Sequence, residues 1–187
     1  MISTPRPHIK TDITKKEFSA GIIIFRRTKE GPKFLILYHG GPYWNFPKGK
    51  LEGESNFKAA LREVQEETGI VQDDLRFKSW FKVQDKFTYV RNKEKIAKVV
   101  TYYLADTKQK EIKIKIVPDT HEGEQHEGYG WFLYRDAVRL LISPTLKQNL
   151  KKAYLAITRK KTGPAPRLSP QTATNSKIPQ ATKNPLI

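Results

Sequence analysis

The chain has 187 residues, of which 35 are Lys or Arg and 19 are Asp or Glu, so its formal net charge is +16. This length suffices for one domain with a buried core, and the charge attracts anions such as nucleotides, polyphosphates and RNA. Cysteine is absent, which excludes disulfides, thiolate metal sites and thiol chemistry. No segment reads as a signal peptide or a membrane span, so we expect a cytoplasmic protein without a membrane partner.

The composition divides the chain into three parts. Residues 1–16 are polar and contain two prolines, which predicts a flexible N-terminal arm. Residues 161–187 are rich in Pro, Thr, Ser, Gln and Asn, carry basic residues and lack acidic and aromatic ones, which predicts a disordered basic tail. The alternation of apolar runs and turn residues typical of a folded domain is confined to residues 17–160.

Five segments of this domain carry strand patterns. Residues 17–27 and 33–38 are rich in β-branched and aromatic side chains and predict two buried strands. Residues 75–90 alternate loosely and predict a strand with a bend, and residues 98–105 predict another strand. Residues 111–116 alternate isoleucine with Glu and Lys, a pattern that predicts an exposed or edge strand.

Between the second and third of these strands, a glycine-punctuated loop leads into an acidic helix. Ser55 and Gly69 are favourable N-cap and C-cap residues and predict a helix between them. On this helix Glu63, Glu66 and Glu67 lie within a sector of roughly 100°, where they repel one another. Such a cluster is either a solvated acidic face or a site for a hard divalent cation, and the basic background of the chain favours the cation.

The C-terminal part completes the pattern. A glycine- and glutamate-rich loop spans residues 119–128, and residues 129–134 predict a short strand. Residues 136–142 predict a helix, and Ser143 followed by Pro144 predicts the start of a last helix. This order of elements fits an α+β fold in which a mixed sheet packs between helices.

The loop and acidic helix resemble the signature of the Nudix hydrolases. In that signature a glycine and a glutamate precede a fixed spacer and an Arg-Glu-apolar-x-Glu-Glu-x-Gly-apolar helix end. The interval from Gly49 to Glu54 is one residue shorter than is usual in the family. The resemblance implies the family's α/β/α sandwich and places a Nudix domain at residues 17–160. The chain matches the signature at Glu54, Arg62, Glu63, Val64, Glu66, Glu67, Gly69 and Ile70.

The resemblance also implies a reaction and its residues. It implies hydrolysis of a phosphoanhydride with Mg²⁺ or Mn²⁺ as cofactor, with Glu63, Glu66 and Glu67 as catalytic and metal-binding residues. The Gly49 carbonyl is expected as a further ligand, and Glu63 is expected to assist the attacking water. We expect Arg62 to brace Glu52 or Glu54 rather than to contact the substrate, because its guanidinium forms fixed hydrogen bonds with carboxylates.

One position of the expected site departs from the family. Relatives place a further metal-binding or basic glutamate in the loop ahead of the last strand, where this chain has Gln125. Glutamine carries no charge and is a poor proton acceptor. We expect Glu124 or Glu127 of the same loop to replace it as a metal ligand.

Residues outside the signature resemble the Nudix branch that cleaves diadenosine tetraphosphate asymmetrically. On this resemblance Trp44, Lys48, Tyr89 and Lys98 are the expected substrate-binding residues. The run from Trp44 to Gly49 also resembles the branch that removes pyrophosphate from RNA 5′ ends, so RNA is a second candidate substrate and partner. Diphosphoinositol phosphates are a third anionic candidate. A different class of protein, a catalytically weakened Nudix-fold module that binds nucleotides or RNA, is the remaining alternative, and the oligomeric state is left open.

Overall fold

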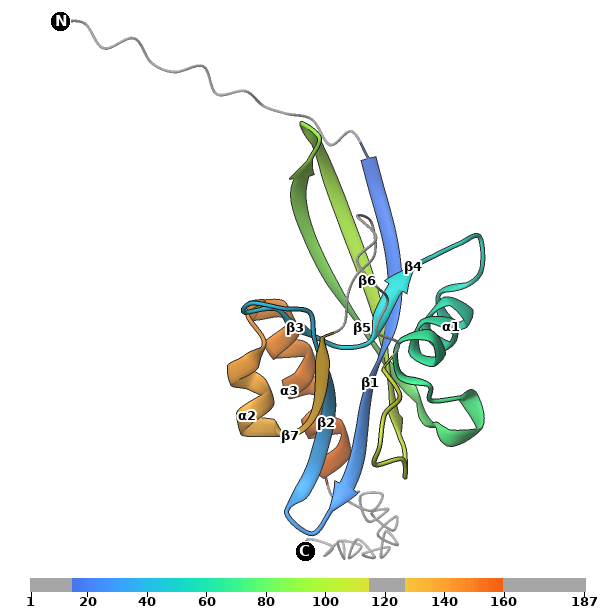
Figure 1. The fold of residues 1–187 in the computed structure, drawn as a ribbon, viewed down its shortest axis with the longest axis vertical. Helices are drawn as coiled ribbons and strands as arrows, with labels where there is room; N and C mark the ends of the chain where they lie inside the picture. Colours follow the sequence, from blue (N-terminus) through green and yellow to red (C-terminus); the bar gives the residue numbers. More distant parts are fainter. Residues whose placement is uncertain (1–14, 115–126, 160–187) are drawn as a thin grey trace, which may run out of the picture.

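One mixed sheet dominates the computed structural model, which describes residues 15–114 and 127–159 (Figure 1). The strand order is β3-β2-β1-β6-β5, with β4 paired to β1 and β7 paired to β2. The described elements are β1 (Lys15–Thr28), β2 (Gly31–Tyr38), β3 (Trp44–Asn45), β4 (Lys48–Lys50), α1 (Asn56–Thr68), the 3-10 helix η1 (Gln72–Asp74), β5 (Arg76–Arg91), β6 (Glu94–Asp106), β7 (Gly128–Leu133), α2 (Tyr134–Leu140) and α3 (Pro144–Thr158).

Strand β1 is the centre of the sheet. It pairs in parallel with β6, from Lys15 opposite Ile96 to Phe25 opposite Asp106. It pairs antiparallel with both β2 and β4. The predicted mixed sheet is therefore confirmed, and the apolar run of β1 is buried because helices cover both faces.

The two faces of the sheet carry separate apolar cores. Ile22 and Ile24 point to the face covered by α1, whereas Ile23 and Phe25 point to the face covered by α2 and α3, as alternation along a strand requires. Figure 1 shows α1 on one side of the sheet and the other two helices on the opposite side. This arrangement confirms the predicted sandwich of helices around a sheet.

Part of the sheet extends beyond the helices. The β5–β6 hairpin and the first residues of β1 project from the body of the domain (Figure 1). We call this region, residues 15–18 and 86–99, the arm. This name does not refer to the flexible N-terminal segment predicted for residues 1–16. Its hairpin turn has Asn92 at φ 52° and Lys93 at φ 65°, the pair of positive φ values that defines a two-residue type I′ turn. The Tyr89 hydroxyl donates to Glu17 at 2.7 Å and ties β5 to β1 across β6.

The structure corrects several predicted boundaries. Strand β1 begins at Lys15 and β6 at Glu94, because the arm continues the pairing beyond the predicted ends. Helix α2 begins two residues before its predicted start. The bend predicted in residues 75–90 is confirmed as a register shift between Phe77 and Lys82. Strand β4 lies where only a loop was predicted.

The strand predicted at residues 111–116 is wrong over its described part, residues 111–114. Ile112 is buried in the core beside α1, and the Lys113 N–H donates to the Thr68 carbonyl at the end of that helix. The alternation therefore reflects packing against a helix end rather than pairing in the sheet.

The predicted tail, most of the predicted N-terminal arm and most of the 119–128 loop lie outside the described residues. Within residues 15–114 and 127–159, no helix is long and apolar enough to cross a membrane.

Candidate active site

Helix α1 fixes the direction of the acidic side chains. The Ser55 hydroxyl accepts from the Lys58 N–H at its start, and Gly69, at φ 70°, ends it with an N–H bonded to the Gln65 carbonyl. Both predicted caps are thus confirmed. The apolar side of the helix packs on β1, so the adjoining flank, with Glu63 and Glu67, faces the short strand β4. The residues buried on the apolar side are Ala59, Ala60 and Val64.

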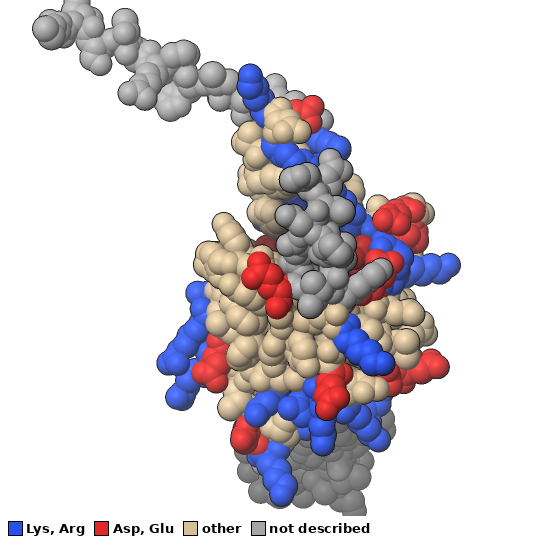
Figure 2. Space-filling view, in the orientation of Figure 1, with Lys and Arg blue, Asp and Glu red and all other residues tan. Residues whose placement is uncertain are grey.

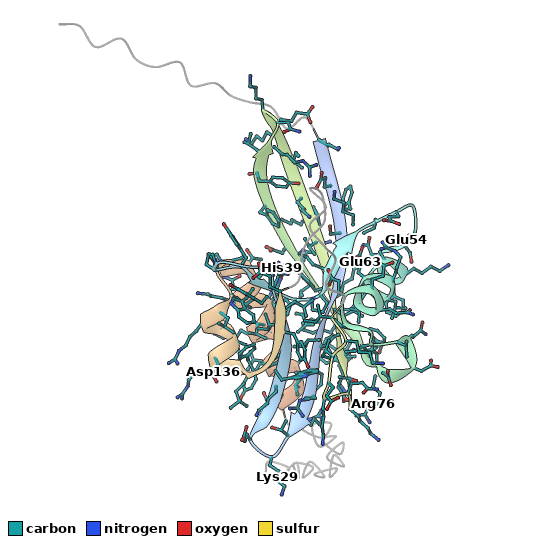
Figure 3. The ribbon with its side chains drawn as sticks, viewed as in Figure 1. Lys29, His39, Glu54, Glu63, Arg76 and Asp136 are labelled. Carbon is teal, nitrogen blue, oxygen red and sulfur yellow. The ribbon has the colours of Figure 1, made fainter. Side chains whose placement is uncertain are left out.

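The Glu63 carboxylate lies directly against Gly49. An ideal Cβ placed on Gly49 would lie 1.9 to 2.1 Å from the carboxyl carbon and oxygens of Glu63, so any larger residue would displace them. Gly49 pairs with Ala20 of β1, which holds this strand in place. In Figure 3 Glu63 lies beside β4, and Glu54 lies in the loop that follows it. The glycine of the signature is therefore required for close approach of a carboxylate to the backbone.

Glu67, one helical turn further on, is also fixed to β4. Its side chain reaches the Lys48 N–H, which donates to Oε2 at 2.9 Å. The residue is only 8% exposed, so this carboxylate sits in a largely desolvated position. Glu63 and Glu67 thus form an acidic wall along β4.

Arg62 ties the loop to the helix. Its guanidinium donates to Glu54 at 2.9 Å, to Glu63 at 2.8 Å and to Glu66 at 3.2 Å. It also donates to the Lys50 carbonyl at 2.8 Å. Of the two braces expected from the sequence, the structure has the one to Glu54.

These contacts shift the pKa values of the cluster. Burial raises the pKa of Glu63; Arg62 opposes the shift, and the charges of Glu67 and Glu66 add to it. The hydrogen bond from Arg62 lowers the pKa of Glu54. Burial lowers the pKa of Arg62, but its bond to Glu54 and the charge of Glu63 more than offset this, so that pKa lies above its ordinary value. The ionised form of Glu63 is therefore disfavoured chiefly by burial, and Arg62 offsets this only in part.

The fit of a divalent metal is partial. Among the residues that the structure describes, no three His, Cys, Asp or Glu side chains are grouped closely enough to hold an ion on their own. Glu66, whose side chain is 54% exposed, does not contact β4 in the described bonds but shares an Arg62 nitrogen with Glu63. The donors that do line β4 are oxygens, the chemistry that Mg²⁺ and Mn²⁺ prefer. A cation here would take Glu63 and Glu67 first and would need further oxygens from elsewhere.

Two of the expected substrate residues lie on one face of the sheet. Lys48 on β4 pairs with Gly21 on β1, and Gly21 pairs on its other side with Tyr102 on β6. Lys98 on β6 pairs with Glu17 on β1. These positions alternate onto the face away from α1. Lys50 belongs to the same face, because it lies two residues after Lys48, and its charge lowers the pKa of Glu17 after the larger effects of Tyr89, burial and Arg91. Sequence reasoning missed Lys50, although its spacing from Lys48 could have indicated it.

Of the other two expected substrate residues, Tyr89 contacts Glu17, the residue opposite Lys98, whereas Trp44 lies apart from this group. The Tyr89 hydroxyl is bonded to Glu17 in the arm. Trp44 packs against Tyr38 and Phe132, with ring centroids 4.8 and 5.5 Å away, at the margin of the core beneath α2 and α3.

The loop expected to supply a replacement glutamate is only partly described. Glu124 and Gln125 lie outside the described residues. The Glu127 N–H donates to the Tyr38 carbonyl at 2.8 Å, and an ideal Cβ on Gly40 would lie 2.5 Å from its carboxylate. Glu127 therefore lies against the β2–β3 connection, and its described contacts do not include the acidic wall.

The fold and this helix define the class of protein. The NUDIX domain family matches residues 15–155, and the chain belongs to that family. It is a Nudix hydrolase of the pyrophosphohydrolase type, a class that typically uses a divalent metal.

The chain is also similar to individual proteins. The chain is 31% identical over 145 residues to the asymmetrical bis(5′-nucleosyl)-tetraphosphatase of Rattus norvegicus, covering 73% of this chain and 92% of the relative. It is 28% identical over 143 residues to the enzyme of the same name from Caenorhabditis elegans. A crystal structure of a C. elegans Ap4A hydrolase binary complex superposes with a TM-score of 0.61 at 25% identity, covering 75% of this chain and 98% of that one.

Proposed function

We propose that this Nudix hydrolase cleaves dinucleoside polyphosphates, with diadenosine tetraphosphate as the representative substrate. The observation that carries the proposal is the similarity to asymmetrical tetraphosphatases over nearly their whole length. The acidic wall of Glu63 and Glu67 beside lysines on the adjoining sheet face supports it, because a polyphosphate needs cations and positive side chains together. Asymmetric attack by water would release ATP and AMP.

The proposal assigns phosphate binding, proton acceptance and positioning to different residues. Lys48, Lys50 and Lys98 bind the phosphate chain on the sheet face. Glu63 accepts the proton of the attacking water from its half-buried position against Gly49. Arg62 is a positioning residue, because it holds Glu54, Glu63 and the β4 carbonyl at once and contacts the substrate through none of these bonds.

Mg²⁺ is the proposed cofactor, with Mn²⁺ as its substitute. Glu63 and Glu67 would hold it, with Gly49, Glu66, Glu124 and Glu127 as candidates for the remaining ligands. Such an ion neutralises phosphate charge and polarises the attacking water.

A substrate panel tests the proposal. The full chain is incubated with diadenosine tetraphosphate, triphosphorylated RNA or a diphosphoinositol phosphate, each with Mg²⁺ or with EDTA, and products are separated by ion-exchange chromatography. We expect equimolar ATP and AMP from the first substrate with Mg²⁺ and no products with EDTA. Glu67→Gln should lower this turnover by a factor of about 100 or more.

Glu30→Gln is the matched control, because it makes the same chemical change outside the acidic wall. Glu30 lies in the turn between β1 and β2, and its described ion pair is with Lys33. This variant should keep the full rate. Faster turnover of triphosphorylated RNA or diphosphoinositol would overturn the substrate assignment. Binding of all three without turnover of any would identify the weakened binding module instead.

A further inference from the structure

One face of the arm continues the face of the sheet that α1 covers. Ala20 is buried beneath α1, and Phe18 lies two residues earlier on the same side of β1. The pairing registers place Phe18, Val99 and Lys86 in one row across β1, β6 and β5. The next row, about 6.6 Å further out, holds Lys16, Ala97 and Thr88. We call these two rows, with Val90 and Lys95 beyond them, the outer face.

The outer face exposes apolar side chains that a soluble sheet would ordinarily bury. Phe18 is 52% exposed and Val90 is 67% exposed, and Val99 between the strands is only partly buried. Isolated exposed apolar residues are common, but here they stand in register with lysines on neighbouring strands. Each row therefore offers both a contact surface and a cation.

The charge of the outer face has one sign. In the described strands its positions include no Asp or Glu, and no described carboxylate pairs with Lys16 or Lys86. The opposite face of the arm differs, because Arg91 pairs with Glu17 there. Figure 2 shows Lys and Arg side chains along the arm, together with acidic side chains near its end, without separating its two faces.

The turn at the tip adds a further lysine at an unfavourable backbone position. Lys93 has φ 65°, in the left-handed region where glycine is preferred in a type I′ turn. A lysine here extends the positive charge of the outer face to the end of the arm. It does so at a conformational cost, which is a reason to assign the charge a role.

We infer that the outer face of the arm binds single-stranded RNA. A base stacks on the exposed ring of Phe18, and the lysines on either side contact the neighbouring phosphates. A second copy of this chain is disfavoured, because two such faces would bring like charges together. RNA is favoured over DNA as the partner, since unpaired bases are its usual recognised form. The inference does not depend on which polyphosphate the acidic wall hydrolyses.

Fluorescence anisotropy of the full chain with a short, labelled, 5′-hydroxyl RNA oligonucleotide tests this inference. Such an RNA has no phosphoanhydride, so hydrolysis does not enter the measurement. The double variant Lys16→Glu, Lys86→Glu should weaken binding at low salt by at least about tenfold. The slope of log affinity against log salt should become shallower by about one to two. Phe18→Ala should weaken binding at least about fivefold, and Phe18→Trp should restore it.

The matched control is Lys151→Glu, Lys152→Glu, which makes the same change of charge on the exposed side of α3. It should keep RNA affinity within about twofold. Thermal unfolding and diadenosine tetraphosphate turnover of each variant show whether the fold and the acidic wall are intact. Equal losses in both double variants, or unchanged affinity in the arm variants, would overturn the inference. So would equal binding of a DNA oligonucleotide, or binding of phosphatidylserine vesicles in place of RNA.

Discussion

At the scale of single residues, Gly49 decides where the acidic wall can form. Glu63 occupies the space that any side chain at position 49 would fill. The carboxylate can therefore lie against the backbone of β4 only because no Cβ is present. Sequence reasoning predicted a role for this glycine through its carbonyl, but the required absence of a side chain depends on the helix–strand distance, which the sequence does not state.

The variant Gly49→Ala tests this close approach. We expect it to displace Glu63 and to lower polyphosphate hydrolysis by a factor of about 100, while the domain stays folded. Turnover and circular dichroism measure the two effects. Gly128→Ala is the control, because its Cβ would meet Tyr38 at an ordinary 3.9 Å. Full activity in Gly49→Ala would contradict the role assigned to this contact.

A second residue-scale prediction concerns the tip of the arm. Lys93→Gly should stabilise the domain by about 0.5 kcal/mol. Glycine removes the steric cost of a side chain at positive φ, and this gain exceeds the additional chain entropy that glycine loses on folding. Urea denaturation measures the change. RNA affinity should fall in the same variant, so that stability and binding move in opposite directions. A loss of stability would show that the Lys93 side chain makes a favourable contact.

At the scale of elements, α1 depends on its C-terminal cap. Gly69→Ala should destabilise the domain by about 1–2 kcal/mol, because the residue has φ 70° and its new Cβ would lie 3.2 Å from the Cβ of Lys113. The measurement is the midpoint of urea unfolding at constant m-value. An unchanged midpoint would mean that the backbone relaxes out of the left-handed region.

Elements with local signals were predictable from the sequence, and elements defined by distant partners were not. The ends of α1 and the start of α3 follow from Ser55, Gly69 and Ser143, whose side chains or backbone act within one helical turn. The length of the arm depends on pairing of β1 with β6, which no local pattern encodes. Residues 111–114 show the converse, since their alternation is typical of a strand although Ile112 packs beside α1.

The same distinction, between features set by local sequence and features set by distant partners, applies to the candidate site. The spacing of Glu63 and Glu67 on a helix placed both on one flank, and the structure sets both against β4. The sequence did not show that one guanidinium nitrogen of Arg62 bridges Glu63 and Glu66 while the other holds Glu54, because that depends on the position of Glu54 and of the Lys50 carbonyl. It also could not show that the Tyr89 hydroxyl is bonded to Glu17.

At the scale of the whole molecule, Glu17 makes stability depend on pH. The Tyr89 hydrogen bond, opposed by burial and assisted by Arg91 and Lys50, lowers its pKa from the ordinary 4.5. Its stabilisation is therefore complete above that value and is lost as pH falls through the lowered pKa of the folded state. Glu17→Gln should lower the free energy of unfolding at pH 7 by about 1 kcal/mol or less, since Arg91 is partly exposed. It should also make the free energy of unfolding depend less steeply on pH in the acid range.

Urea denaturation from neutral to acid pH measures this difference between the parent and Glu17→Gln. The two curves should converge at the acid end, where the carboxyl of the parent is protonated. A constant difference at all pH values would assign the effect of the substitution to packing instead of charge.

The parallel pairing of β1 with β6 has a consequence for synthesis on the ribosome. Ile24 lies opposite Ala105, so the most apolar strand emerges from the exit tunnel well before the strand that flanks it is translated. Until then β2 and β4 can pair only with the opposite edge of β1, and the edge that accepts β6 stays open to other chains or to a chaperone. Slowing translation while β1 is outside the exit tunnel and β6 is not should therefore increase co-translational aggregation, whereas the same pause after β6 has left the tunnel should not.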